Sequence, residues 1–304
     1  MGTYYSVKYV PDQKLLSVNE VQGVVEHVLE VANQQMSTYR PESEISKWNQ
    51  SAHGGKVSPW FFQVASFSLL LAEKTHGVFD PTVAPFVNAW GFGPDERTQE
   101  PSDKSLKRTL QKTGYKNIIV DEKTRTLIKK QPEVQLDLSS TAKGSAVDKV
   151  SEALMFLGLV NHFVDVGGEI KAAGVKLQGQ KWVVGIEKAN GDKQVQLSLP
   201  LESKAIATSG NYRNFYENSQ GEIRHHTIHP KTGKPIESVF TSVSVVSDTC
   251  MEADGLATAF MVMSESEAQE YIEKHHVIVF LVYKNMKNKI LASAGFKKFY
   301  GKAL

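Results

Sequence analysis

The chain has one cysteine among its 304 residues, Cys250. It can therefore form neither an internal disulfide nor a zinc site built from several thiolates. A lone cysteine does not fix the compartment, because many exported proteins lack disulfides. An excess of charge of one sign is also missing, since 35 Lys and Arg against 33 Asp and Glu leave a net charge of +2. This near-balance argues against a general nucleic-acid-binding protein.

Long apolar runs are absent as well. The longest, at residues 277–283, is far shorter than the roughly 20 residues that span a bilayer, and it predicts a buried strand. The first residues, Met1 to Tyr5, resemble a strand and lack the charged start and apolar stretch of a signal peptide. We therefore expect either a cytosolic protein or an exported one whose leader lies outside this sequence.

Several enzyme motifs are missing too. The sequence has no GxSxG, GxxxxGK[ST], HExxH or GxGxxG pattern. Nucleotide chemistry in this protein would therefore use neither a P-loop nor a Rossmann fingerprint.

Helix and strand signals are interspersed along the chain. Ser17 and Glu20 form a capping box before a helical apolar pattern that ends near residue 36. Further helices are predicted after Ser58-Pro59, over 146–157 and over 249–263, the last begun by Ser247 or Asp248. Strand signals fall at 162–166, 169–174, 181–186, 242–246, 277–283 and 289–293, and residues 115–138 suggest a hairpin followed by a strand. Without strict alternation, this order favours an α+β fold.

The stretch Val134–Val150, VQLDLSSTAKGSAVDKV, is the most informative part of the chain. An apolar run ends at Asp137, a loop of small residues follows, and a helix is expected to open around Lys143-Gly144. A helix N-terminus with free N–H groups favours anions, so the stretch suggests a phosphate-bearing ligand. An ordinary strand-turn-helix connection explains the same residues.

Asp254 and Thr258 lie four residues apart on the helix predicted over 249–263, so they share one face. A carboxylate among apolar neighbours is costly to bury unless it is paired or metal-bound. A carboxylate and a hydroxyl are hard oxygen ligands that suit Mg²⁺. The alternative is a partly exposed Asp and a Thr that bonds to its own helix.

Two further segments allow a functional and a structural interpretation. Thr208–Arg213, TSGNYR, follows a short apolar strand, and Arg213 could meet a phosphate or hold a surface turn. His225, His226 and His229 lie in a loop rich in Pro and Gly. This is weak support for zinc; a single proton-accepting His or exposed histidines explain it equally well.

Taken together, these segments resemble the ApbE family, the FAD:protein FMN transferases, in the family's order and over nearly the whole chain. The matching motifs are Met1-Gly2-Thr3; Ser37-Thr38-Tyr39 with Ser43-Glu44 and Asn49; Phe79–Val83 with Trp90–Gly93; Asp137-Leu138 with Ala142-Lys143-Gly144; Val166-Gly167-Gly168; Ser209-Gly210 with Tyr212-Arg213; His226-x-Ile228 with Pro230–Pro235; and Ala253-Asp254 with Ala257-Thr258.

The resemblance implies an ApbE-like fold, related to the T-fold, with mixed sheets and packed helices. Residues 1–304 would form one flavin transferase domain, or two closely packed subdomains with the FAD site between them. The implied reaction transfers FMN from FAD to a Thr or Ser hydroxyl of an acceptor protein, needs Mg²⁺ and releases AMP. The alternatives are an FAD pyrophosphatase that yields FMN and AMP, and a non-enzymatic periplasmic flavin-binding lipoprotein.

The resemblance also assigns residues. His226 is the expected proton acceptor, and Asp137 is expected to act both in catalysis and in FAD binding. Ser140, through its carbonyl, would hold Mg²⁺ with Asp254 and Thr258. The FAD-lining residues would be Met1, Tyr39, Val78, Phe79, Asp80, Asp137, Lys143, Arg213 and Ile228. Two departures stand out: His229 occupies a position where the family often has Asp, and Gly255 replaces a common Ala.

The expected partners are FAD and flavin-bearing subunits of the sodium-pumping NADH:quinone reductase or the Rnf complex. No nucleic acid is expected. Family members are typically lipoproteins of the bacterial inner membrane that face the periplasm. We therefore expect membrane contact only through a lipid anchor on a cysteine upstream of this sequence.

Overall fold

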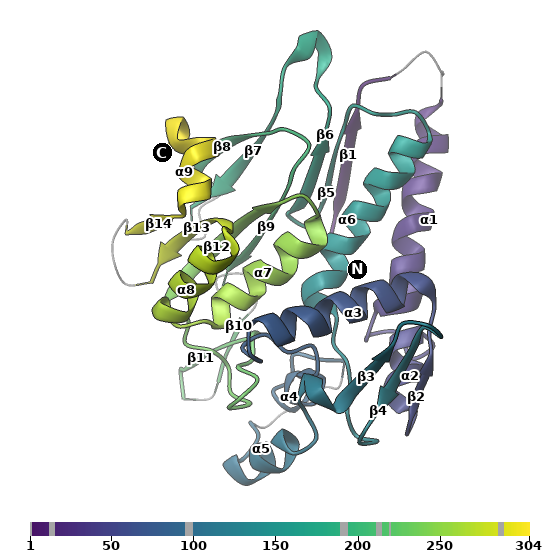
Figure 1. The fold of residues 1–304 in the computed structure, drawn as a ribbon, viewed down its shortest axis with the longest axis vertical. Helices are drawn as coiled ribbons and strands as arrows, with labels where there is room; N and C mark the ends of the chain where they lie inside the picture. The colour runs from purple at the N-terminus through teal and green to yellow at the C-terminus, as the bar shows by residue number, and fades with distance from the viewer. Residues whose placement is uncertain are drawn as a thin grey trace. The chain divides into compact units, whose positions relative to one another are not determined.

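The computed structural model describes residues 2–11, 16–94, 100–188, 194–210, 215–218, 220–284 and 289–304. The chain divides into two compact units. Unit 1 comprises residues 1–31, 141–213 and 238–304, and unit 2 comprises residues 32–140 and 214–237. Helices and strands are mixed in both units, which confirms the predicted α+β class (Figure 1).

Unit 1 is built on a seven-stranded sheet. Its strands, in spatial order, are β1 (Tyr5–Tyr9), β5 (His162–Val166), β6 (Glu169–Ala173), β9 (Ala205–Gly210), β12 (Phe240–Ser247), β13 (Ile278–Tyr283) and β14 (Ile290–Ala292). Every neighbouring pair is antiparallel. Such a sheet can bury each face against a different layer, because side chains alternate between faces along every strand.

The two faces of this sheet have separate apolar cores. Val164 packs with residues of α1 (Val18–Met36) and α6 (Ser139–Phe156). Its neighbour Phe163 points to the other face and packs with the hairpin of β7 (Trp182–Glu187) and β8 (Val195–Leu201). The remaining helices of unit 1 are α7 (Cys250–Val262), α8 (Glu265–His275) and α9 (Ala294–Tyr300). Gly144 of α6 lies against the first residues of α7, Cys250 and Met251, next to the polar groups discussed below (Figure 1).

Unit 2 has smaller sheets than unit 1, and a larger share of its residues lies in loops. Its helices are α2 (Glu44–Gln50), α3 (Pro59–Lys74), α4 (Ala84–Ala89) and α5 (Asp103–Leu110). Its strands are β2 (Gly54–Lys56), β4 (Thr126–Lys129) and β3 (Ile118–Asp121) in one sheet, and β10 (Phe215–Glu217) and β11 (Ile223–His225) in another. A short 3₁₀ turn lies at Tyr115–Asn117 in this unit. Two others, at Leu177–Gly179 and Gly301–Ala303, belong to unit 1.

Most predicted elements are confirmed. The capping box of Ser17 and Glu20 is present, with each side chain bonded to the other residue's backbone N–H. The predicted hairpin is β3 and β4. The helix predicted over 249–263 exists, but its N-cap is Thr249, whose side chain accepts from the Glu252 N–H, and not Ser247 or Asp248.

Two predictions around Asp137 are wrong. The helix expected to open at Lys143-Gly144 begins at Ser139, because the Asp137 carboxylate accepts the Ser139 N–H at 2.8 Å and starts the helix one turn earlier. The strand expected before Asp137 is not formed. Leu136 is fully buried, but its N–H and C=O bond to the side-chain amide of Asn49. The alternating apolar residues correctly indicated burial. The Asn49 side chain, however, makes the hydrogen bonds that a neighbouring strand would make.

None of the helices in the described ranges has both the length and the apolar character needed to cross a bilayer.

Candidate functional site

The helices α6 and α7 approach each other closely at Gly144. A Cβ at this position would lie 2.3 Å from the carbonyl oxygen of Cys250, so only glycine fits here without a shift of the backbone. The approach lets the Gly144 N–H donate to Asp254 Oδ2 at 2.9 Å.

Lys143 brings two carboxylates together beside this contact. Its ammonium lies 2.9 Å from Glu169 Oε1 and 3.4 Å from Asp254 Oδ1. Both acids are buried, with Asp254 at 2% and Glu169 at 5% exposure. Lys143 and Asp254 are therefore neighbours in the fold, although 111 positions separate them in the sequence.

Burial and charge oppose each other in this group. Burial raises the pKa of Asp254, and the Lys143 ammonium and the Gly144 N–H counter part of that rise. Burial also raises the pKa of Glu169 to about 7, with Lys143 lowering it and Asp254 raising it. Burial lowers the pKa of Lys143, but the two carboxylates outweigh it, so the net pKa is raised and the side chain stays charged. Two carboxyl groups thus share one cation.

Asp148 fixes the start of α7 from the neighbouring helix. Its carboxylate accepts the N–H groups of Cys250 and Met251 at 3.0 and 2.9 Å and pairs with Lys171 at 2.7 Å. A carboxylate at a helix N-terminus is favoured by the helix dipole and by the unpaired N–H groups. Asp148 therefore holds α7 in place and has its own cation, unlike the pair of acids on Lys143.

The residues of α7 fit a hard divalent cation. Asp254 Oδ2 accepts the Gly144 N–H, whereas the only contact of Oδ1 with a described residue is the one of 3.4 Å to Lys143. Thr258 lies one turn further along α7 and is partly exposed. Two carboxyl groups that share the single Lys143 ammonium favour an additional cation here. Ser140, in the first turn of α6, belongs to unit 2, and its role as a ligand stays a prediction.

Histidine, cysteine and carboxylate side chains do not gather in threes as a transition-metal site anywhere in the described ranges. This outcome disfavours the zinc interpretation of His225, His226 and His229 for the described residues. His229 instead shapes its loop: its backbone bonds to Lys234 and Gly233, and its ring accepts the Lys231 N–H at 3.2 Å. A ring nitrogen can thus take the acceptor role that a carboxylate would have at this position.

In unit 2, the predicted residues Val78, Phe79 and Asp80 are all buried. Asp80 accepts the Thr82 N–H and hydroxyl at 2.8 and 2.6 Å and the Tyr115 N–H at 2.8 Å. Burial raises the pKa of Asp80, and these donors lower it. The carboxylate therefore closes the loop that carries Val78 and Phe79, and its contact with FAD stays a prediction.

Asp137 and Tyr39 lie in one electrostatic neighbourhood of unit 2. Asp137 is partly exposed, and its N–H donates to the Pro81 carbonyl. Burial raises the pKa of the Tyr39 phenol, and the Asp137 carboxylate adds to the rise. Tyr39 is nevertheless 66% exposed, with its hydroxyl donating to the Phe92 carbonyl at 2.9 Å.

Phe92 connects Tyr39 to the predicted proton acceptor. Its ring meets the His226 ring edge to face, with centroids 6.4 Å apart, and the Tyr216 ring at 5.2 Å. Ile228, which is 4% exposed, packs in the same apolar cluster as Phe86, Trp90 and Phe92. The supporting role of Phe92 was not predicted, although Phe92 lies in the Trp90–Gly93 motif that resembles the family.

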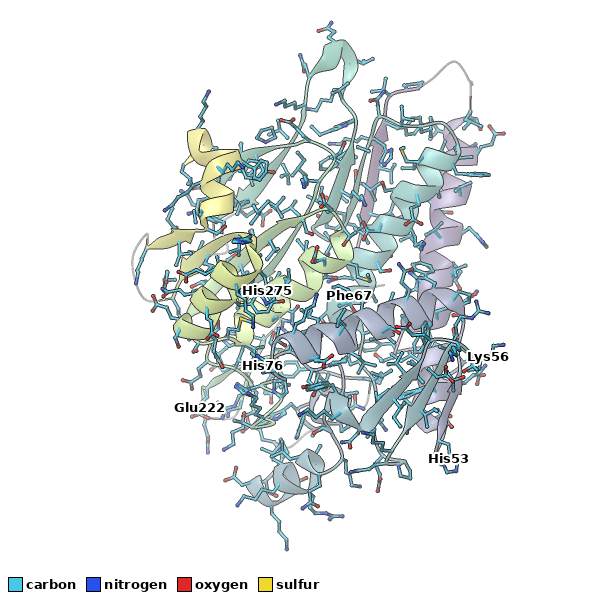
Figure 2. All side chains as sticks on the ribbon, in the orientation of Figure 1. His53, Lys56, Phe67, His76, Glu222 and His275 are labelled. Carbon is cyan, nitrogen blue, oxygen red and sulfur yellow. The ribbon has the colours of Figure 1, made fainter. Side chains whose placement is uncertain are left out.

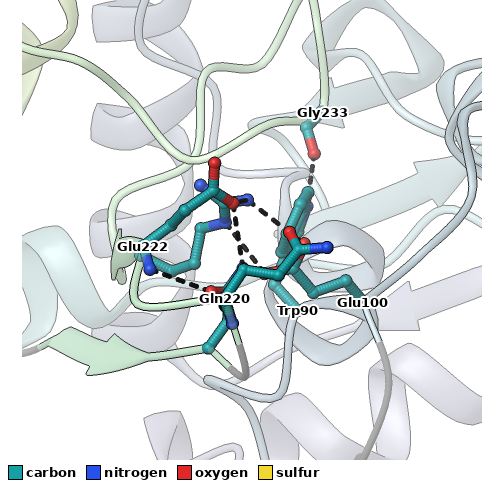
Figure 3. A network of polar contacts seen from close by, with 7 residues as sticks. Trp90, Glu100, Gln220, Glu222 and Gly233 are labelled. Carbon is teal, nitrogen blue, oxygen red and sulfur yellow. Dashed lines mark hydrogen bonds and ion pairs between the residues drawn. The ribbon is translucent and has the colours of Figure 1, made fainter.

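A polar network surrounds this cluster (Figure 3). Trp90 donates its indole N–H to the Gly233 carbonyl at 2.7 Å. Arg224 forms ion pairs with Glu100 at 2.8 Å and Glu222 at 2.5 Å and lies over the Trp90 ring. The network fixes the strand β11, which ends next to His226.

A cavity of about 380 Å³ lies elsewhere in unit 2. It is lined by residues of α2 and β2, among them Trp48 and Lys56, which is labelled in Figure 2. None of the residues predicted for FAD or the metal lines it.

Two predicted FAD contacts, Met1 and Arg213, lie outside the described residues. The segment before Arg213 forms the end of β9, where the Thr208 and Ser244 hydroxyls are 2.8 Å apart. Glu169 was missed by sequence reasoning. The available signal was its position directly after Gly167-Gly168, where a break between two strands places a charged residue among apolar ones.

Comparisons with known proteins agree with the fold. A family model described as the ApbE family matches residues 1–281. An FAD:protein FMN transferase of Vibrio cholerae is 39% identical over 308 residues, covering 99% of this chain and 91% of that protein. One of Haemophilus influenzae is 37% identical over 308 residues, covering 98% and 89%. The solved structure of the flavin transferase ApbE from Vibrio cholerae has a TM-score of 0.90 at 38% identity and covers 98% of this chain and 96% of that chain.

Proposed function

This chain belongs to the ApbE family and is a flavin transferase, and from that premise we propose that it transfers FMN from FAD to a Thr or Ser hydroxyl of an acceptor protein. The hydroxyl oxygen attacks the FMN-side phosphorus, a new phosphoester bond forms, and the bond to the bridging oxygen breaks. AMP leaves with that oxygen, and the hydroxyl proton passes to a base.

The reaction places negative charge on the pyrophosphate, which a cation must neutralise. Mg²⁺, when bound, would polarise the phosphoryl oxygens and stabilise the leaving phosphate. Asp254 and Thr258, with the carbonyl of Ser140, are the residues we propose to hold it. The support lies in the buried, under-paired Asp254 Oδ1 and in the excess of acid over base around it.

For proton transfer we propose His226. It is partly buried and held against Phe92, whose carbonyl also fixes Tyr39. A neutral imidazole can accept the hydroxyl proton. Asp137 is proposed to assist catalysis and to contact FAD. The other proposed FAD contacts are Met1, Tyr39, Val78, Phe79, Asp80, Lys143, Arg213 and Ile228.

The single observation that carries the proposal is the Lys143, Asp254 and Gly144 contact. It places a phosphate-compatible cation and a metal-compatible carboxylate side by side. If the two helices only packed against each other, neither Lys143 nor Asp254 would need to be a charged residue.

The test uses FAD, Mg²⁺ and an acceptor domain with its target Thr, followed by in-gel flavin fluorescence and chromatography of nucleotides. We expect a covalent flavin band and AMP in equal amounts, and no band with a Thr→Val acceptor. Free FMN formed at the same rate without acceptor would favour the pyrophosphatase. FAD binding without any product would favour a flavin carrier.

The acceptor and the compartment are proposed from the family resemblance alone. We propose subunits of the sodium-pumping NADH:quinone reductase or Rnf type as acceptors, on the periplasmic side of a bacterial inner membrane. Labelling of intact cells with an impermeant reagent, with a cytoplasmic marker as control, tests the location. Protection of the protein together with that marker would contradict it.

A further inference from the structure

Glu169 is the buried acid of unit 1 to which the proposed reaction gives no role. It opens β6 directly after two glycines, and its side chain is 7% exposed. Oε1 lies 2.9 Å from the Lys143 ammonium, and Oε2 has no hydrogen-bond partner among the described residues. A buried carboxylate oxygen without a partner is costly, so a purely structural role explains this residue poorly.

The lysine is shared unequally between its two acids. It lies closer to Glu169, at 2.9 Å, than to Asp254 Oδ1, at 3.4 Å. Asp254 is held firmly only through Oδ2, by the Gly144 N–H. The ammonium is thus drawn toward Glu169, and Asp254 Oδ1 keeps only one long contact.

The surrounding charges do not change this balance. Asp148, which lies on α6, forms an ion pair with Lys171 at 2.7 Å and accepts the Cys250 N–H at the start of α7. The Cys250 thiol lies in the same region, and burial raises its pKa far above the usual value, so it stays neutral. Glu169 is therefore the anion that competes with Asp254 for Lys143.

We propose that Glu169 is a positioning residue that holds the Lys143 ammonium away from Asp254 Oδ1, so that this oxygen stays open for the divalent cation. The proposal rests on the proposed function, because it concerns the same cation. Glu169 acts through Lys143 and touches neither the substrate nor the metal. Without it, the lysine would pair fully with the one remaining acid and compete with the metal for it.

The test is Glu169→Gln, which keeps the shape of the side chain and removes its charge. Mn²⁺ serves as the probe, titrated in the presence of FAD and followed by electron paramagnetic resonance of the free ion. We expect the variant to bind Mn²⁺ about tenfold more weakly than the wild type, because Lys143 then neutralises Asp254. Unchanged affinity would overturn the proposal.

Loss of a nearby negative charge would also weaken metal binding, without any help from Lys143. The same substitution is therefore made in a Lys143→Met background. If Glu169 acts through the lysine, Glu169→Gln should change Mn²⁺ affinity less than twofold in that background. An equal loss of affinity in both backgrounds would assign a direct electrostatic effect and overturn the positioning role.

Two controls separate this result from misfolding and from failure of the proposed function. Glu152→Gln removes an exposed acid from α6 that pairs with Lys149, and it should leave Mn²⁺ affinity unchanged. Metal-free melting curves should show a folded Glu169→Gln protein. A wild type that binds FAD but no Mn²⁺ would overturn the metal site and this inference together, whereas normal wild-type binding with an unaffected variant would overturn this inference alone.

Discussion

Two aspartates are buried to a similar degree, one in each unit, and their surroundings differ. Asp80 in unit 2 is 8% exposed and accepts three hydrogen bonds of 2.8 Å or less from Thr82 and Tyr115. Asp254 in unit 1 is 2% exposed and has one short bond, from Gly144, and one long contact, to Lys143. Asp80 is surrounded by neutral donors, whereas Asp254 shares its only cation with a second acid.

The difference separates a carboxylate that shapes a loop from one that is available to a ligand. Fully bonded buried groups stabilise a unique structure, and partly bonded ones are costly unless something else completes them. By this criterion, Asp254 should matter mainly for activity, and Asp80 mainly for stability.

The largest effect is expected at Asp254. Asp254→Asn keeps the acceptor for Gly144 but removes the charge that a divalent cation needs. We expect the rate of flavin transfer to fall by roughly 10²–10⁴-fold, while the midpoint of urea unfolding changes little. Measurement of both on the same preparation checks this. Unfolding that accounts for the lost activity would place Asp254 with Asp80 as a structural group.

Gly144→Ala should affect stability and activity together. The added methyl group would lie 2.3 Å from the Cys250 carbonyl oxygen and force α6 and α7 apart. We expect a loss of about 3 kcal/mol in the free energy of unfolding. Gly23→Ala on α1 is the matched control, since a Cβ there meets nothing within 4 Å and should stabilise the helix slightly. Equal behaviour of the two variants would contradict the close approach.

Asp80→Asn should reduce stability with little direct effect on the chemistry. One amide oxygen can still accept from Thr82, but the NH₂ group then faces the Tyr115 N–H, which loses its acceptor. We expect a loss of about 2 kcal/mol in urea unfolding. Activity per folded molecule should stay within a few fold of the wild type. Because Asn keeps a polar side chain of the same shape at the proposed FAD contact, only a much larger loss of activity per folded molecule would place Asp80 with Asp254.

The smallest effect concerns pH and the metal-free protein. Burial raises the pKa of Glu169 from 4.5 to about 7 in the folded state, so the folded protein binds this proton more tightly than the unfolded chain. The stabilisation is complete below about pH 4.5 and is lost as the pH rises through 7. In EDTA, the wild type should lose roughly 1–2 kcal/mol more than Glu169→Gln between about pH 5 and pH 7. Parallel pH profiles of the two proteins would contradict the raised pKa.

The sequence predicted elements well where the signal was local. The capping box of Ser17, the Pro59 helix start and the strand signal at 162–166 depend on residues a few positions apart, and all appear in the structure. A similar signal was overlooked at α8, where Ser264 and Glu267 form a capping box. The strand expected before Asp137 failed because its hydrogen-bond partner, Asn49, comes from 87 positions away.

The sequence predicted which types of residue form the candidate site, but it did not predict how their charges are balanced. Asp254 and Thr258 followed from helical spacing, and Lys143 from the family resemblance. Glu169 was missed because nothing nearby in sequence indicates that it faces Lys143. The phosphate site expected from free N–H groups at Gly144 was wrong in its detail, since that N–H is engaged by Asp254.

The sequence by itself determined the α+β class, the starts of α1 and α3, the family and the acids and hydroxyls suited to a hard cation, because these depend on local pattern and on motif order. Only the tertiary structure decided which acid is satisfied and which is not. The hydrogen bonds of Asp254 come from Lys143 and Gly144, which lie 111 and 110 positions away in the sequence. Two aspartates that look alike in the sequence are therefore distinguished only by their neighbours in the fold.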